Sequence, residues 1–313
     1  MSGDPVCISY IDVMQERLIG TYDHGLEGPL LICVGAMHGN ETAGIRALEL
    51  ALKMLEVEPV TNPEFTFHGR FVALVGNVGA MRVGKRFQDR DLNRIWNDLP
   101  DLISDLESDE RQELEQAVDR EIAKTDQKVV LLDLHTTTAD GGIFTFPDGS
   151  DSGIELGSEL GAPVILSMMD LLPGTCMDYF SRKYPNRLTG LAFEGGQHRD
   201  PIAVNRMIAA LVSCLRAMGC VSARHIAHEH DRILDQYSSG LPKVSRVTYR
   251  HGIVEADRFK MKDGFSNFDQ VKKGEVLATD QRGVILAPSS GFLLMPHYQL
   301  QGNDGFFIIE ESK

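Results

Sequence analysis

Two histidines and a glutamate stand at the ends of predicted strands, where they could bind one metal ion. His38 and Glu41 follow the apolar run of residues 30–37, which is typical of a buried strand, and a helical pattern begins at about Glu41. A second apolar run, residues 129–134, leads directly into His135. The carboxyl ends of parallel strands meet at one edge of an open α/β sheet, and two imidazoles with a carboxylate are typical ligands of a catalytic zinc. We therefore predict one zinc ion per chain, with ordinary capping and core roles as the alternative.

A hydrolytic zinc site also needs a base, and Glu194 is the candidate. Zinc lowers the pKa of its water to about 7, and a nearby carboxylate then moves the proton from the water to the leaving nitrogen. Glu194 follows the apolar run of residues 188–193 and precedes two glycines, so it lies at another strand end. The alternative is a buried glutamate that caps a neighbouring helix.

The segment of residues 84–94 could hold an anionic substrate, because it is rich in arginine in an acidic chain. Asn93 and Arg94 could bind a carboxylate through an amide donor and a forked guanidinium. Arg86 could stabilise the negative oxygen formed on attack, and Asp91 could accept the free N–H of a zinc-binding imidazole. Taken alone, such a cluster is more often a turn with ion pairs. The predicted zinc ligands on both sides of it favour the functional interpretation.

The overall composition is that of a globular protein with an excess of negative charge. The chain has 313 residues, of which 42% are hydrophobic and 24% charged, and its net charge is −14. This charge argues against nucleic acid and anionic membranes as partners. No apolar run approaches the roughly 20 residues of a membrane span, and no signal-peptide pattern begins the chain. The five cysteines have no paired spacing and predict free thiols, which indicates a cytoplasmic protein.

The order of predicted elements divides the chain into two unequal domains. Over residues 1–222, strand-like runs alternate with helical patterns, which is typical of an α/β architecture. Residues 223–241 are polar and predict a solvated connector, and residues 242–313 predict a smaller all-β domain of short strands with Gly and Asp turns. The predicted strands lie near residues 29–35, 71–77, 128–134, 163–167, 189–193, 244–250, 275–279, 284–287, 292–295 and 306–310, and the helices near 41–55, 102–123 and 201–218.

Taken together, these motifs resemble the succinylglutamate desuccinylase/aspartoacylase family of zinc carboxypeptidase-like hydrolases. The matching set, in family order, is Gly35-x-x-His38-Gly39-Asn40-Glu41, Gly84-Lys85-Arg86-Phe87 with Asp91-Leu92-Asn93-Arg94, Asp133-Leu134-His135-Thr136, and Glu194-Gly195. The resemblance implies an α/β fold in which a mixed, mostly parallel sheet lies between helices, with a smaller C-terminal β domain.

The same resemblance implies a role for each residue of the motifs. His38, Glu41 and His135 correspond to the zinc ligands, Glu194 to the general base, Arg86 to the oxyanion and substrate contact, and Asn93 with Arg94 to a carboxylate clamp. Family members also place an aromatic residue and an arginine shortly before the base to hold the substrate. Tyr179 and Arg182 are the candidates for these two positions.

The activity that the resemblance implies is hydrolysis of the amide bond of a small anionic N-acyl amino acid. A metallocarboxypeptidase acting on a short peptide is the first alternative, although the spacing from Glu41 to His135 leaves little room for peptide subsites. A non-catalytic zinc-binding scaffold is the second, and the presence of Glu194 and Arg86 argues against it. The sequence leaves open the acyl group, the amino acid and the oligomeric state, a homo-oligomer included.

Overall fold

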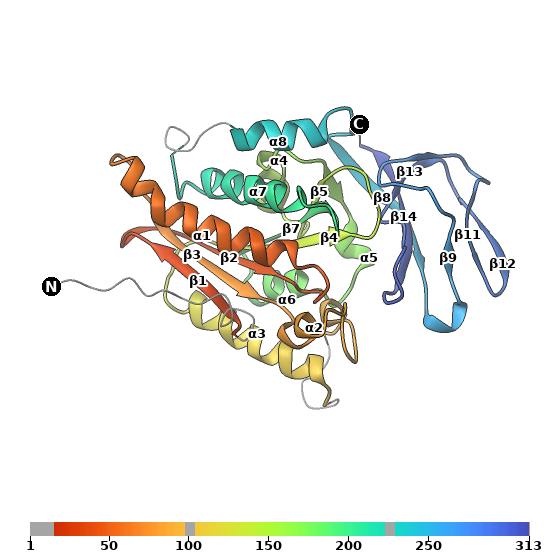
Figure 1. The fold of residues 1–313 in the computed structure, drawn as a ribbon, viewed down its shortest axis with the longest axis horizontal. Helices are drawn as coiled ribbons and strands as arrows, with labels where there is room; N and C mark the ends of the chain where they lie inside the picture. Colours follow the sequence, from red (N-terminus) through yellow and green to blue (C-terminus); the bar gives the residue numbers. More distant parts are fainter. Residues whose placement is uncertain (1–15, 98–103, 223–228, 313) are drawn as a thin grey trace.

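A long mixed β-sheet with helices on both faces dominates the fold (Figure 1). The computed structural model describes residues 16–97, 104–222 and 229–312. Among these residues, eleven strands form one sheet in the order β1-β3-β2-β4-β7-β5-β6-β8-β14-β13-β10, and three form a small sheet in the order β12-β11-β9. The strands are β1 (Leu18–Asp23), β2 (Leu26–Gly35), β3 (His68–Val75), β4 (Val129–Thr137), β5 (Phe144–Pro147), β6 (Val164–Leu166), β7 (Leu188–Gln197), β8 (Val244–Gly252), β9 (Lys260–Met261), β10 (Gln270–Val271), β11 (Val276–Asp280), β12 (Gly283–Leu286), β13 (Gly291–Leu294) and β14 (Asp304–Glu311). The helices are α1 (Ala43–Thr61), α2 (Val78–Arg82), η1 (Leu92–Arg94), α3 (Leu106–Ile122), α4 (Asp151–Glu159), α5 (Met168–Leu171), α6 (Cys176–Lys183), α7 (Ala203–Ala217), α8 (Glu229–Ser238) and η2 (Glu255–Asp257).

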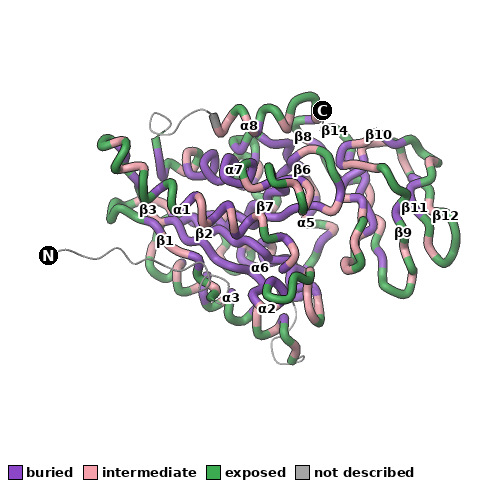
Figure 2. The backbone as a smooth tube through the Cα atoms, viewed as in Figure 1, coloured by how far each residue is buried: buried purple, intermediate pink, exposed green. Residues whose placement is uncertain are grey.

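Strand β2 shows why the sequence forms two helix layers around the sheet. Its side chains alternate between the faces, so that Leu31 and Cys33 pack with α1 and α7, whereas Ile32 and Val34 pack with α3 and α6. All four residues are 0% exposed, and Figure 2 shows buried residues along the central strands. Because both faces of the strand are covered, its sequence is a continuous apolar run rather than an alternating one.

The strand directions confirm the predicted mixed sheet, which is mostly parallel from β1 to β6 in the sheet order, with a smaller C-terminal β part. Strands β3, β2, β4 and β7 run parallel, β5 runs antiparallel to β7, and β6 is parallel to both β5 and β8. Every predicted strand and helix has a counterpart with ends shifted by a few residues, and residues 102 and 103 of one predicted helix lie outside the described residues. The predicted strands do not include β1, β5, β9 and β10.

The C-terminal strands partly extend the main sheet and partly form a sheet of their own. Strand β8 pairs with β6, and β14, β13 and β10 follow as antiparallel neighbours. Strands β9, β11 and β12 form the separate three-stranded sheet, drawn at the right of Figure 1. The domain boundary at residue 242 stays a prediction, and backbone pairing between β6 and β8 connects the two sides of it.

Part of the segment predicted to be a solvated connector, residues 223–241, forms helix α8. The helix contributes Leu234, which is 1% exposed, to the core that α1 and α7 also share, and Ile233 and Tyr237 pack at its edge. These few apolar residues stand in a polar segment, and only the neighbouring helices show what they pack against. Residues 223–228 of the connector lie outside the described residues.

Cys33, Cys176, Cys214 and Cys220 are buried free thiols, as predicted, and Cys7 lies outside the described residues. Across the described residues, the helices are all too short or too polar to cross a membrane.

Truncating a central core side chain should test the importance of this packing. Leu132 of β4 is 0% exposed in the core beneath α1 and α7, and we expect Leu132→Ala to lower the free energy of unfolding by about 2–5 kcal/mol. Leu300→Ala is the matched control, because that side chain is 103% exposed and should change stability by no more than about 0.5 kcal/mol. Urea denaturation of both variants measures the difference. Equal losses would contradict the packing described here.

Candidate active site

The turn between β2 and α1 places His38 and Glu41 at the carboxyl end of the sheet. Ala36 turns the chain there with a left-handed φ of 53°. Gly39 then lies against α2 so closely that a Cβ would stand 2.2 Å from the backbone of Ala80, and only glycine fits such an approach. The turn leaves His38 and Glu41 buried, at 5% and 2% exposure.

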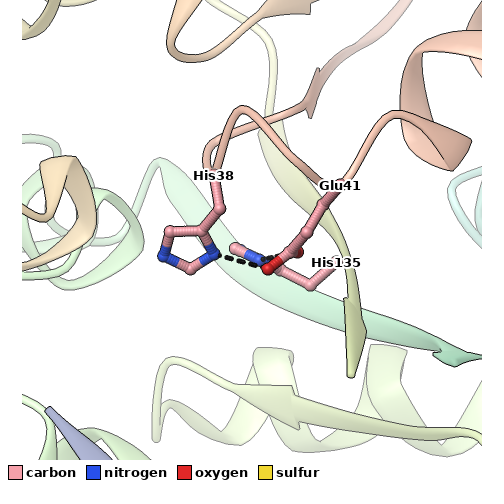
Figure 3. A group of neighbouring side chains, drawn as sticks. All are labelled: His38, Glu41 and His135. Atoms are coloured by element: carbon pink, nitrogen blue, oxygen red, sulfur yellow. Dashed lines mark hydrogen bonds and ion pairs between the residues drawn. The ribbon is translucent and has the colours of Figure 1, made fainter. Parts of the chain in front are cut away.

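The carboxylate of Glu41 lies between two imidazole rings (Figure 3). Its Oε1 is 2.8 Å from Nδ1 of His38, and its Oε2 is 3.0 Å from Nδ1 of His135 on β4. One donor atom from each of these side chains lies within 4.8 Å of the others. Burial opposes ionisation of Glu41, but the two imidazoles hold the pKa of Glu41 well below its ordinary value. The structure thus brings the three predicted ligands together around one point.

The second nitrogen of each imidazole faces an aspartate. Nε2 of His38 lies 3.2 Å from Oδ1 of Asp91 and 2.8 Å from Nη2 of Arg86, and Nε2 of His135 lies 2.8 Å from Oδ2 of Asp133. Carboxylates in this position fix the tautomer of a metal-binding imidazole and leave its other nitrogen to the metal. Two imidazole nitrogens and one carboxylate supported in this way fit a catalytic zinc.

Sequence analysis predicted this contact for Asp91 but missed Asp133. The signal was present, because Asp133 interrupts an apolar strand and stands two residues before His135, on the same strand face. A carboxylate at 2% exposure needs a polar partner, and the imidazole two residues on supplies it.

Glu194 lies beside His135 on the adjacent strand. Strands β7 and β4 are parallel, and the two residues are register partners. Glu194 is 2% exposed, and its Oε2 has no hydrogen-bond partner among the described residues. A buried carboxylate oxygen without a hydrogen-bond partner lowers the stability of the fold unless a ligand or a water molecule binds to it. Burial raises the pKa of Glu194 to about 8, although a charged His135 acts in the opposite direction.

The guanidinium of Arg86 lies between Asp91 and the donor cluster. Its Nε and Nη2 donate to Oδ2 of Asp91 at 3.1 and 2.9 Å, and its Nη1 lies 3.5 Å from Oε1 of Glu41. The side chain is 12% exposed. Arg86 is therefore positioned next to the predicted metal ligands, as the sequence suggested.

A buried glutamate on α3 holds the loop of residues 84–94. Glu107 is 0% exposed and accepts the backbone N–H groups of Gln88, Asp89 and Arg90 at 2.7, 2.9 and 3.1 Å. Sequence analysis missed this contact, because the carboxylate and the loop come from separate elements. The loop geometry depends on α3 as well as on its own turns.

Arg94 pairs with a carboxylate from near the C-terminal end of the chain. Its Nη2 donates to Oδ2 of Asp304 at 2.7 Å, and its Nη1 donates to the carbonyl oxygen of Asn93 at 2.7 Å. The amide oxygen of Asn93 in turn accepts the backbone N–H of Cys176 at 2.8 Å. The structure brings Asn93 and Arg94 to the site, but it gives Arg94 an internal partner that sequence analysis missed.

A cavity of about 70 Å³ lies over the donor cluster. Part of its wall comes from residues 295–304, a segment between β13 and the start of β14. This segment is fixed by hydrogen bonds from Thr138 Oγ1 to the carbonyl of Pro296, at 2.8 Å, and from the Gln301 amide to the carbonyl of Phe87, at 3.1 Å. The lining residues are His38, Glu41, Arg86, Asn93, Arg94, His135, Thr136, Thr137, Thr138, Phe146, Leu172, Thr175, Glu194, His198, Met295, His297, Gln299, Gly302, Asn303 and Asp304.

The structure corrects the placement of Tyr179 and Arg182, which do not line the cavity. The hydroxyl of Tyr179 donates to Glu115 on α3. The side chain of Arg182 is 59% exposed and pairs with Asp178 at 2.9 Å. Helix α6 directs both side chains away from the donor cluster, and Phe146, Leu172 and Thr175 contribute to the wall instead.

Comparison with known proteins identifies the class to which this fold and site belong. Residues 27–184 match the family described as the succinylglutamate desuccinylase/aspartoacylase catalytic domain. The chain therefore belongs to the succinylglutamate desuccinylase/aspartoacylase family, which confirms the resemblance seen in its motifs.

Individual relatives agree with this assignment. A succinylglutamate desuccinylase of Pseudomonas putida is 38% identical over 114 residues, which are 36% of this chain and 32% of that protein. A succinylglutamate desuccinylase of Pseudomonas paraeruginosa is 28% identical over 278 residues, 85% of this chain and 77% of that protein. The structure of the succinylglutamate desuccinylase of Vibrio cholerae matches with a TM-score of 0.64 at 19% identity, covering 91% of this chain and 82% of that one. At this identity the structural match concerns the fold alone.

Proposed function

We propose that this protein is a zinc-dependent, cytoplasmic hydrolase that removes the acyl group from a small N-acyl amino acid. One zinc per chain would be held by His38, Glu41 and His135. The observation that carries the proposal is that these donors share one small buried cavity with the unpartnered carboxylate oxygen of Glu194. Membership of the family supports the same reaction class.

In this proposal, a zinc ion held by His38, Glu41 and His135 would supply Lewis acidity to the amide carbonyl and to a water molecule. Glu194 accepts the proton of the attacking water on its free Oε2 and passes it to the leaving nitrogen. The water oxygen bonds to the carbonyl carbon, the C–N bond breaks, and a carboxylate and a free amine result. Arg86 stabilises the negative charge that develops on the carbonyl oxygen.

Asn93 and Arg94 are the proposed contacts for the carboxylate of the amino acid. Both line the cavity, and the amide nitrogen of Asn93 is available because the amide oxygen is already bound to Cys176. The small cavity, walled by residues 295–304, favours a small substrate over the peptide of a metallocarboxypeptidase.

Replacing Arg86 and Arg94 in turn should distinguish the residue that acts in the chemical step from the residue that binds the substrate. We expect Arg86→Ala to lower kcat by about 10²–10³, because it removes one donor to the developing negative charge. Arg94→Ala should instead act mainly on KM, because its proposed contact is made equally to bound substrate and transition state. Steady-state kinetics of both variants measures the split, with the exposed Arg199→Ala as control. Small and equal effects on both parameters would contradict these roles.

A direct test of the proposed function is a substrate panel. Purified protein loaded with one equivalent of zinc is assayed for amine release from N-acetyl, N-butanoyl and N-succinyl amino acids and from short peptides. Hydrolysis of N-acyl amino acids that is abolished by chelation and restored by zinc is the expected result. Turnover of peptides alone, or no turnover at all, would overturn the proposal.

A further inference from the structure

The charges around the cavity restrict what it can bind. Among the described residues that line it, the guanidinium groups belong to Arg86 and Arg94. Each already has a carboxylate partner within the chain, Asp91 at 2.9 Å and Asp304 at 2.7 Å respectively. The cavity therefore offers little uncompensated positive charge to a ligand.

Asp304 contributes a negative charge directly to the cavity wall. Its Oδ2 accepts from Arg94, and its Oδ1 accepts from Nε of Arg250 on β8 at 2.6 Å. Burial opposes ionisation of Asp304, but the two arginines hold its pKa below the ordinary value, so that it stays charged at neutral pH. These three residues together carry a single positive charge, enough for one carboxylate of a substrate.

Outside the proposed metal site, the described residues of the rest of the wall supply no further cation. Burial lowers the pKa of His198 and lowers that of His297 to about 4, so both rings are neutral at pH 7. The apolar side chains of Phe146, Leu172 and Met295 form another part of the wall. Apolar surface favours the hydrocarbon part of an acyl group but leaves a buried carboxylate without a partner.

We propose that the cavity selects N-acyl amino acids with a short, uncharged acyl group, and that Asp304 determines this selectivity by excluding a second carboxylate. The inference deepens the proposed function and rests on it. A dicarboxylate substrate would place its second charge in a small, partly desolvated cavity that contains Asp304 and has no unpaired arginine among its described lining residues. An acetyl or butanoyl group meets no such repulsion.

Three substrates separate charge from size. N-acetyl-L-alanine, N-butanoyl-L-alanine and N-succinyl-L-alanine share one amino acid, and the last two have acyl chains of equal length that differ by a carboxylate. With the zinc-loaded protein, we expect kcat/KM for the succinyl compound to be at least about tenfold below that for the butanoyl compound. Turnover of the succinyl compound as fast as the butanoyl one would overturn the inference while leaving the proposed function intact. If none of the three were hydrolysed, the proposed function would fail, and the inference with it.

Two variants should move this selectivity in opposite directions. Asp304→Asn removes a negative charge from the wall and should raise the ratio of succinyl to butanoyl kcat/KM about tenfold. Arg250→Gln removes a positive charge behind Asp304 and should lower the same ratio, which a general loss of folding could not do. Glu310→Gln, an exposed position on the same strand as Asp304, is the control and should leave the ratio unchanged. Unchanged ratios in both test variants would overturn the role of Asp304. If Asp304→Asn fails to fold, the ratio measured for Arg250→Gln tests the role of Asp304 by itself.

Binding without turnover gives an independent readout. In zinc-loaded protein carrying Glu194→Gln, butanoate should raise the Tm more than succinate at equal concentration. Adding Asp304→Asn should reverse or abolish that order. Stronger stabilisation by succinate when Asp304 is present would contradict the proposed exclusion.

Discussion

Replacing Glu194 by glutamine should lower kcat by about 10²–10⁴ while zinc content and fold remain those of the parent protein. Glutamine keeps the size of the side chain but cannot accept the proton of the attacking water. Because Glu194 acts only when it is ionised, the parent activity should rise with pH through the pKa of Glu194. This acidic limb of the pH–rate profile should be absent from the variant.

The controls for this variant separate catalysis from stability. Glu155→Gln, on the exposed side of α4, makes the same substitution away from the cavity and should keep full activity. Zinc content per chain and thermal unfolding are measured on both proteins. A Glu194→Gln protein that is less stable but hydrolyses N-acyl amino acids at nearly the parent rate would assign Glu194 a structural role.

Replacing His135 by alanine should remove zinc and activity together. The side chain is one of three predicted ligands, so its loss would leave zinc with only two protein ligands. Elemental analysis should show zinc falling from one per chain toward none after dialysis. Circular dichroism should show the sheet intact, because the surrounding core of β4 is unchanged.

Loss of stability is the main competing explanation for such a result. His135→Ala leaves Asp133 buried without its imidazole partner, and removing one partner of a buried pair is destabilising. His135→Gln keeps a donor near Asp133 and should fold better while still binding zinc poorly. His68→Ala, at an exposed position on β3, is the control. Full zinc content in either His135 variant would contradict the predicted ligand set.

The strands that position the predicted ligands could be recognised from the local sequence alone. Strands β2 and β4 are buried on both faces over most of their length, so each contains an apolar run that leads to the carboxyl end of the sheet. Glu194 lies within β7 after an apolar run of the same kind, and its register with His135 brings the proposed base beside a proposed ligand. Short or polar elements were not recognised, among them β5 and α8, because their packing partners lie elsewhere in the chain.

The sequence by itself indicated the family and the α/β alternation, and it supplied the candidate ligands His38, Glu41 and His135 with the candidate base Glu194. These features are encoded in local runs and short motifs, where residue type and spacing are sufficient. Only the tertiary structure decided which charges share the cavity. Asp304 meets Arg94 across 210 positions of sequence, and α6 turns Tyr179 away toward α3. Electrostatic and steric contacts act through space, so the charge balance of a site depends on how distant segments pack and not on any one of them.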